Sequence, residues 1–112
     1  MTEEKSYRDM SEHEIRQEVG RLMEKARKAE ALGIINEYAV YQRKALMAQS
    51  FLVDLSTIVP GEIYKIEGDD AYFHVDYLKG RFAWGYRLGG SKLEEALPVA
   101  MLKPLKKNEQ TK

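Results

Sequence analysis

Apolar residues in the first half of the chain recur at spacings of three and four, which is the period of an α-helix. One such stripe follows Ser11 and consists of Ile15, Val19, Leu22, Ala26 and Ala29. Ser11 and Glu14 match the capping box, in which two side chains satisfy backbone amides at a helix start. Gly33 is the expected end, because glycine adopts the left-handed conformation after a helix without steric cost. The pattern predicts a first helix between Ser11 and Gly33.

A second apolar stripe begins almost at once and predicts another helix. Asn36 is a suitable N-cap, and the helix is expected to run to about Val53. Its stripe consists of Tyr38, Tyr41, Ala45, Ala48 and Leu52. A connection this short makes the two helices antiparallel neighbours. We therefore predict an antiparallel helical hairpin over residues 11–56, preceded by a polar segment at residues 1–10.

After Pro60 and Gly61 the apolar period changes to the alternation of β-strands. Turn residues and prolines divide the rest of the chain into five short strands, expected at 62–66, 71–78, 82–87, 93–97 and 101–105. A flat sheet of five short strands with two open edges is a poor independent unit, and curling into a small barrel removes the edges. The predicted fold class is α+β, with a small β barrel over residues 57–105 and a polar tail at 106–112.

Composition excludes several functions. The chain has no cysteine, which excludes disulfides and thiolate catalysis and suits a reducing cytosol. Lys and Arg number 18, as do Asp and Glu, and neither half of the chain has the basic excess typical of a nucleic-acid binder. No apolar run approaches the roughly 20 residues of a membrane-spanning helix, and residues 1–10 do not form a secretory signal. We expect a cytoplasmic protein without a membrane partner.

His74 and Asp76 are the one pair that suggests chemistry, because residues two apart on a strand share a face. They could act as an acid–base pair or as half of a metal site. The favoured interpretation is two solvated polar residues, since the spacing implies no third ligand and no nucleophile. We therefore expect no catalytic residue, no metal, no cofactor and no small-molecule substrate, and thus no enzyme.

Aromatic residues are concentrated in the predicted barrel. Seven fall within 23 residues: Tyr64, Tyr72, Phe73, Tyr77, Phe82, Trp84 and Tyr86. Phe73, Val75 and Tyr77 are expected on one face of their strand. Most of the aromatic residues are expected in the core, but both strand faces carry them, so some are expected to point outward.

The candidate binding surface consists of Tyr72, His74, Arg81, Trp84 and Arg87. Exposed aromatic rings beside arginines could bind a peptide, enclose a cation or stack on bases. The favoured hypothesis is a protein-interaction or adaptor module that binds a partner or a second copy. The alternative is a nucleic-acid-associated regulator that uses Lys79 and the two arginines, which the neutral net charge argues against.

Two resemblances extend this interpretation. The segment Ala96–Leu102 resembles the end of SH3-like barrels, where a strand, a 3₁₀ turn and a last short strand follow each other. Nearly the whole chain resembles the YfhH-like family of small uncharacterised proteins from Bacillus and relatives. The matching segments are Arg27–Glu30, Asn36–Val40, Pro60–Tyr64, Phe82–Leu88 and Glu94–Pro98. The resemblance implies a helical hairpin plus a five-stranded SH3-like barrel in a cytoplasmic bacterial setting. It implies no activity and no site residues.

Overall fold

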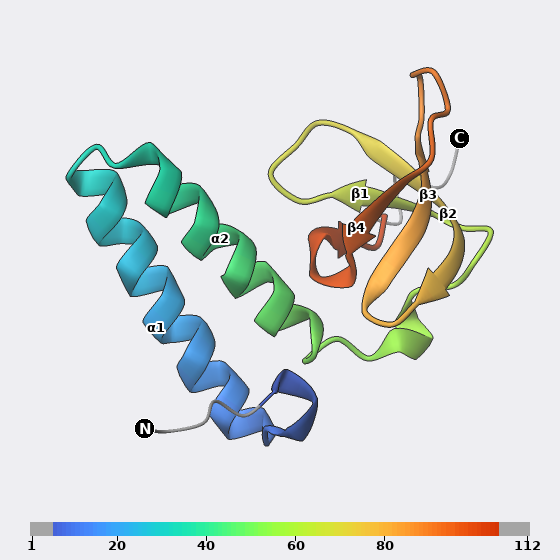
Figure 1. Cartoon of the computed structure of the whole chain (residues 1–112). Coiled ribbons are helices and arrows are strands. Elements are labelled where there is room, and N and C mark those ends of the chain that lie inside the picture. The colour runs from blue at the N-terminus through green and yellow to red at the C-terminus, as the bar shows by residue number, and fades with distance from the viewer. Residues whose placement is uncertain (1–5, 106–112) are drawn as a thin grey trace. The chain divides into compact units, whose positions relative to one another are not determined.

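The structure, a computed structural model, describes residues 6–105 of the 112-residue chain. The chain divides into two compact units, and the division falls between Leu52 and Val53. The first unit is a helical hairpin and the second is built around an antiparallel sheet (Figure 1). The predicted α+β class is confirmed. In the described residues, no helix combines the length and apolarity needed to cross a bilayer.

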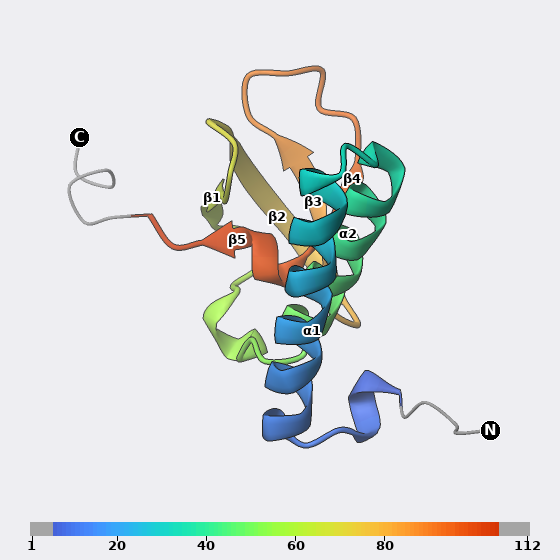
Figure 2. The ribbon, with the colours of Figure 1, turned by 90° about the vertical axis from the view of Figure 1, so that its left-hand side faces the viewer.

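The first unit consists of α1 (Glu12–Ala31) and α2 (Ile35–Ser50), preceded by the short 3₁₀ helix η1 (Tyr7–Asp9). The two long helices lie side by side and run in opposite directions (Figure 1, Figure 2). All five apolar residues of the predicted stripe on α1 are buried: Ile15, Val19, Leu22, Ala26 and Ala29. The predicted hairpin is therefore confirmed, and α1 packs through the face that the period of its sequence indicated.

The start of α1 is fixed by the predicted capping box. The Glu14 amide donates to Ser11 Oγ at 3.1 Å, and the Ser11 amide donates to Glu14 Oε1 at 2.9 Å. Two amides that the helix cannot pair internally are thereby satisfied.

Replacing Ser11 with alanine is expected to destabilise the hairpin by about 1 kcal/mol, because the Glu14 amide loses its acceptor. Chemical denaturation followed by far-ultraviolet circular dichroism measures this loss. Ser91→Ala is the matched control, since Ser91 is exposed in the loop before β4, and it should change stability by less than about 0.5 kcal/mol. Equal losses in both variants would show that the cap contributes nothing.

The connection between the helices differs from the prediction at one residue. Gly33 does end α1, with φ of +76°. Its amide bonds to Glu30 O, and the Ile34 amide bonds to Ala29 O, which together form a Schellman motif. The predicted N-cap at Asn36 is wrong: α2 begins at Ile35, and Ile34 holds the N-cap position without a side-chain hydrogen bond. The motif places Ile34 so that its carbonyl accepts from Tyr38, and the helix starts before Asn36 is reached.

The second helix also ends earlier than Val53. Ser50 is its last residue, and the amides of Phe51 and Leu52 bond to Ala48 O and Gln49 O in tighter, three-residue turns. The Ser50 hydroxyl is buried and donates to Leu46 O at 2.9 Å. Serine hydroxyls that bond back to a preceding carbonyl compete with the regular helical bonds, which accounts for a stop at this residue.

Five antiparallel strands form the second unit: β1 (Ile63–Ile66), β2 (Tyr72–Lys79), β3 (Phe82–Arg87), β4 (Glu95–Pro98) and β5 (Leu102–Lys103). Their order across the sheet is β4-β3-β2-β1-β5. The 3₁₀ helices η2 (Leu55–Thr57) and η3 (Val99–Met101) flank them in sequence. Within residues 6–105 no strand pairing joins β4 to β5, so the sheet is not closed, and SH3-like barrel character stays a prediction.

One face of this sheet carries the core of the second unit. The buried residues are Ile58, Tyr64, Ile66, Phe73, Val75, Ala83, Leu97, Val99 and Leu102. Tyr64 is the residue of this cluster whose side chain carries a polar group. Its hydroxyl donates to Thr57 O at 3.1 Å and accepts from the Val59 amide at 2.7 Å. Of the seven clustered aromatic residues, only Tyr64 and Phe73 are buried. The expectation that most of them form the core is wrong, and the others lie elsewhere on the sheet.

Candidate binding surface

The outer face of the sheet, opposite the core, carries most of the aromatic side chains. Along β3, Ala83 and Gly85 are buried, whereas Phe82, Trp84 and Tyr86 alternate with them and remain half-buried. Strand pairing brings these three beside residues of β2 on the same face. We call the resulting set the aromatic face, which comprises Tyr72, His74, Tyr77, Phe82, Trp84 and Tyr86.

A β-bulge in β2 places Tyr77 on this face. Val75 pairs with Gly85, and Tyr77 pairs with Trp84, so Asp76 is the extra residue between two registers. The alternation that was predicted to put Tyr77 with Phe73 and Val75 is therefore interrupted. Tyr77 turns outward instead, with 43% of its surface exposed.

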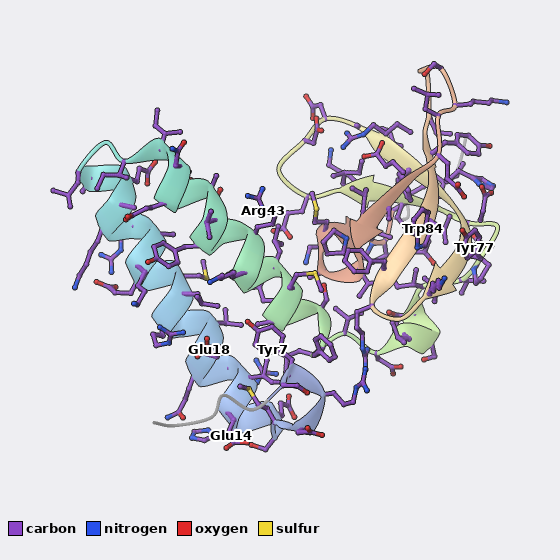
Figure 3. The ribbon with its side chains drawn as sticks, viewed as in Figure 1. Tyr7, Glu14, Glu18, Arg43, Tyr77 and Trp84 are labelled. Carbon is purple, nitrogen blue, oxygen red and sulfur yellow. The ribbon has the colours of Figure 1, made fainter. Side chains whose placement is uncertain are left out.

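The aromatic face contains two stacked pairs from neighbouring strands. The rings of Tyr77 and Trp84 are parallel within 2°, with centroids 6.0 Å apart (Figure 3). The rings of His74 and Tyr86 are 4.9 Å apart and inclined by 20°. Cross-strand ring pairs of this kind hold the side chains in defined positions. The face therefore presents pre-positioned rings.

Two rings of the aromatic face, Tyr72 and Tyr86, have a lysine ammonium group over them. Lys65 Nζ lies 5.4 Å from the Tyr72 ring centroid, and Lys92 Nζ lies 5.5 Å from that of Tyr86. Both separations are within the range of cation–π attraction. The aromatic face already accepts ammonium groups from its own chain.

His74 and Asp76 are close on the outer side of β2, where Asp76 is exposed and His74 is partly buried. His74 Nδ1 lies 3.2 Å from Asp76 Oδ1, a separation that suits an ion pair when the imidazole is protonated. Nδ1 is nonetheless shielded from solvent and has no hydrogen bond of acceptable geometry in the described residues. No group of three or more potential metal ligands occurs in the part of the chain that the structure describes. The geometry gives these residues no further chemical partner.

The two arginines of the predicted surface have structural contacts. Arg81 Nη1 donates to Val53 O at 3.0 Å. Arg87 lies opposite Phe73, on the core side at the end of β3, and not beside Trp84. Its guanidinium bonds to Glu95 at 3.0 and 3.2 Å and to Asp69 at 2.9 Å. Hydrogen bonds to Glu95 and then Asp69 raise the pKa of Arg87 above its ordinary value. Of the predicted surface, the structure brings Tyr72, His74 and Trp84 together on one face.

Carboxylates flank the Tyr77–Trp84 pair. Asp76 adjoins Tyr77 in the bulge, and Glu94 Oε2 accepts from the Tyr77 hydroxyl at 3.4 Å. Desolvation, followed by the nearby charges of Glu94 and Asp76, raises the pKa of Tyr77 above its ordinary value. Two carboxylates therefore act on the Tyr77 ring, while Lys79 follows two residues later on β2, opposite Phe82.

An open pocket of about 730 Å³ lies in the hairpin unit and is lined by residues that include Tyr7, Met10, Met47 and Phe51. Arg21 on its rim is ion-paired with Glu18, and the hydrogen bond from Arg21 lowers the pKa of Glu18. The pocket therefore combines apolar side chains with the ion-paired Arg21 and Glu18 and with Arg8.

Comparison with known proteins identifies the family of the chain. A family model described as a protein of unknown function, DUF1811, matches residues 5–103. The chain belongs to the DUF1811 family. It is 48% identical over 99 residues to the uncharacterised protein YfhH of Bacillus subtilis (strain 168), an alignment covering 88% of this chain and 95% of that protein. The resemblance to the YfhH-like family that the sequence indicated is confirmed.

The sequence interpretation of this DUF1811 protein did not include Tyr77, Phe82 and Tyr86 of the aromatic face, nor Glu94 beside it. Tyr86 could have been included, because it alternates with Trp84 along the same strand. Tyr77 could not, because a bulge leaves no clear mark in hydrophobic alternation. Glu94 lies outside the strands, and only the folded chain brings it to Tyr77.

Proposed function

We propose that this chain is a non-enzymatic binding module that docks a partner protein on its aromatic face. The observation that carries the proposal is the placement of six aromatic rings on the outer side of the sheet, none of them in the buried core. Contiguous apolar patches of this kind mark interaction sites, and tyrosine and tryptophan are enriched where binding energy is concentrated. The proposal includes a cytoplasmic setting, which the lack of cysteine suits.

Charge favours a protein partner over a nucleic acid. Arg87, which the nucleic-acid hypothesis needed, is bonded to Asp69 and Glu95, and Arg81 donates to a backbone carbonyl. Lys65 lies 3.6 Å from Asp70. Phosphate binding depends on cations that are available to replace counterions. Lys65, Arg87 and Lys103 are thus matched by carboxylates of the same chain, whereas Lys79 and Lys92 form no ion pair within residues 6–105 and are the cations that the nucleic-acid alternative retains.

Tyr77→Ala is expected to weaken partner binding at least tenfold, a loss of about 1.4 kcal/mol. Tyr77 is exposed, so its removal spares the core while taking away one ring of the Tyr77–Trp84 pair. Partners are captured from a bacterial lysate on the immobilised chain, purified, and titrated against the wild type and the variant by calorimetry. Tyr38→Ala, a tyrosine of α2, is the matched control and should bind as the wild type does.

Two results would contradict the proposal. One is a purified partner that binds Tyr77→Ala as tightly as the wild type. The other is binding of a thymine oligonucleotide that strengthens as salt is lowered and is lost in Tyr77→Ala, which would instead support the nucleic-acid regulator. A second copy as the occupant would be recognised by light scattering, as a dimer that Tyr77→Ala dissociates.

A further inference from the structure

We propose that the docking segment of the partner presents an arginine, which the Tyr77–Trp84 pair and the carboxylates of Asp76 and Glu94 hold together. This inference rests on the proposed function and names the chemistry of the partner. The juxtaposition that carries it is a stacked aromatic pair with two carboxylates near its exposed tyrosine, Tyr77.

The first argument is charge matching within the sheet unit. Four carboxylates are ion-paired with lysine or arginine of the same chain: Glu67 with Lys103, Asp70 with Lys65, and Asp69 and Glu95 with Arg87. Asp76 and Glu94 form no ion pair with a lysine or an arginine within residues 6–105, as is also true of Asp54 and Glu62. Of these four carboxylates, Asp76 and Glu94 are the two whose charges act on Tyr77. Asp76 lies near His74, and Glu94 accepts from the Tyr77 hydroxyl. Residues 6–105 therefore leave the charge of Asp76 and Glu94 to be matched by a cation of the partner.

The second argument comes from the aromatic rings. Lysines of this chain lie over Tyr72 and Tyr86, which shows that rings of this face accept cations at 5.4 and 5.5 Å. No lysine or arginine in the described part of the chain lies over Tyr77 or Trp84. Tryptophan is the strongest cation–π acceptor among the side chains. The ring best suited to a cation is therefore one over which residues 6–105 place no lysine or arginine.

Arginine fits this arrangement better than lysine. A guanidinium is planar and stacks on aromatic rings, while its N–H groups bond to carboxylates at its edge. An ammonium group offers a point charge and cannot use both features together. Glu94 lies at the hydroxyl end of the Tyr77 ring and Asp76 precedes Tyr77 in the bulge, so both carboxylates are within the neighbourhood that the donors of a stacked guanidinium would reach.

Trp84 gives a direct readout, because it is the only tryptophan of the chain. The probe is a short alanine–proline peptide with two arginines, compared with the same peptide in which citrulline replaces arginine. Citrulline keeps the shape of the side chain and removes its charge. Titration of Trp84 fluorescence is expected to show at least tenfold tighter binding of the arginine peptide, and this preference should shrink as salt is raised.

Neutral variants test the two carboxylates. In Asp76→Asn/Glu94→Gln the preference for arginine over citrulline should disappear. Glu30→Gln/Glu37→Gln removes the same charge from exposed positions in the hairpin and should keep the preference. Circular dichroism confirms that each variant is folded.

The inference is overturned if the two peptides bind equally, if neither changes Trp84 fluorescence, or if the Asp76→Asn/Glu94→Gln variant keeps the wild-type preference. None of these results contradicts the proposed function. That proposal is tested separately, by whether a purified partner binds Tyr77→Ala more weakly than the wild type. One further outcome is a partner that binds Asp76→Asn/Glu94→Gln normally but fails to bind Tyr77→Ala. That result would support docking on the aromatic face and contradict the proposal that the partner presents an arginine.

Discussion

Gly85→Ala is expected to destabilise the sheet unit by roughly 3 kcal/mol, the top of the usual range for overpacking. A β-carbon at this position would lie 1.8 Å from His74 O, 2.9 Å from its carbonyl carbon and 3.2 Å from the Asp76 amide nitrogen. All three atoms belong to the backbone of β2, so no change of rotamer relieves the overlap. The strands can separate or slip, and either outcome disrupts the pairs that Trp84 and Tyr86 form across them.

Urea unfolding followed by Trp84 fluorescence measures this effect, because the only tryptophan lies in the sheet unit. Gly90→Ala is the matched control: its β-carbon would come no nearer than 3.9 Å to another group, and the φ of Gly90 is not positive. That variant should unfold within about 0.5 kcal/mol of the wild type. Similar midpoints for the two variants would show that the close approach at Gly85 is unimportant.

Phe73→Ala is expected to cost about 3–5 kcal/mol. The side chain is 0% exposed and lies in the cluster that contains Ile66 and Val75. Removing the ring loses its transfer free energy and leaves a cavity that rigid strands fill only in part. The same fluorescence-detected unfolding experiment measures the loss.

Phe82→Ala provides the comparison for Phe73. The same ring is deleted, but Phe82 is half-buried on the aromatic face, so the loss of stability should be clearly smaller. If both variants lost equal stability, the assignment of one sheet face to the core and the other to binding would be wrong.

The first helix could be predicted almost completely because its signals are local. Ser11 and Glu14 are three residues apart, and Ile15 to Ala29 follow one helical face. Asn36 shows where local reasoning stops. Asn36 does not serve as the N-cap, because the Schellman motif at Gly33 positions Ile34 as the N-cap and α2 begins at Ile35. The competing hydrogen bonds come from the preceding helix and leave no sign at Asn36 itself.

The aromatic face could be predicted only in part. Alternation of small and large residues on β3 is visible in the sequence, and it places Trp84 and Tyr86 together. Which side faces the core depends on packing, and the small residues Ala83 and Gly85 are the buried ones, contrary to the preference of large rings for the core. The roles of Arg81 and Arg87 depend on partners from 8 to 28 residues away, which no spacing rule identifies.

Arg87 also has a consequence for the timing of folding. It ties Asp69, in the turn between β1 and β2, to Glu95, the first residue of β4, so one side chain joins three separate segments. These contacts require that β3 already be paired with both neighbouring strands. Interactions that form after the rate-limiting step slow unfolding and leave the folding rate nearly unchanged. If the Arg87 contacts form after that step, the guanidinium prolongs the lifetime of the folded sheet without hastening its assembly.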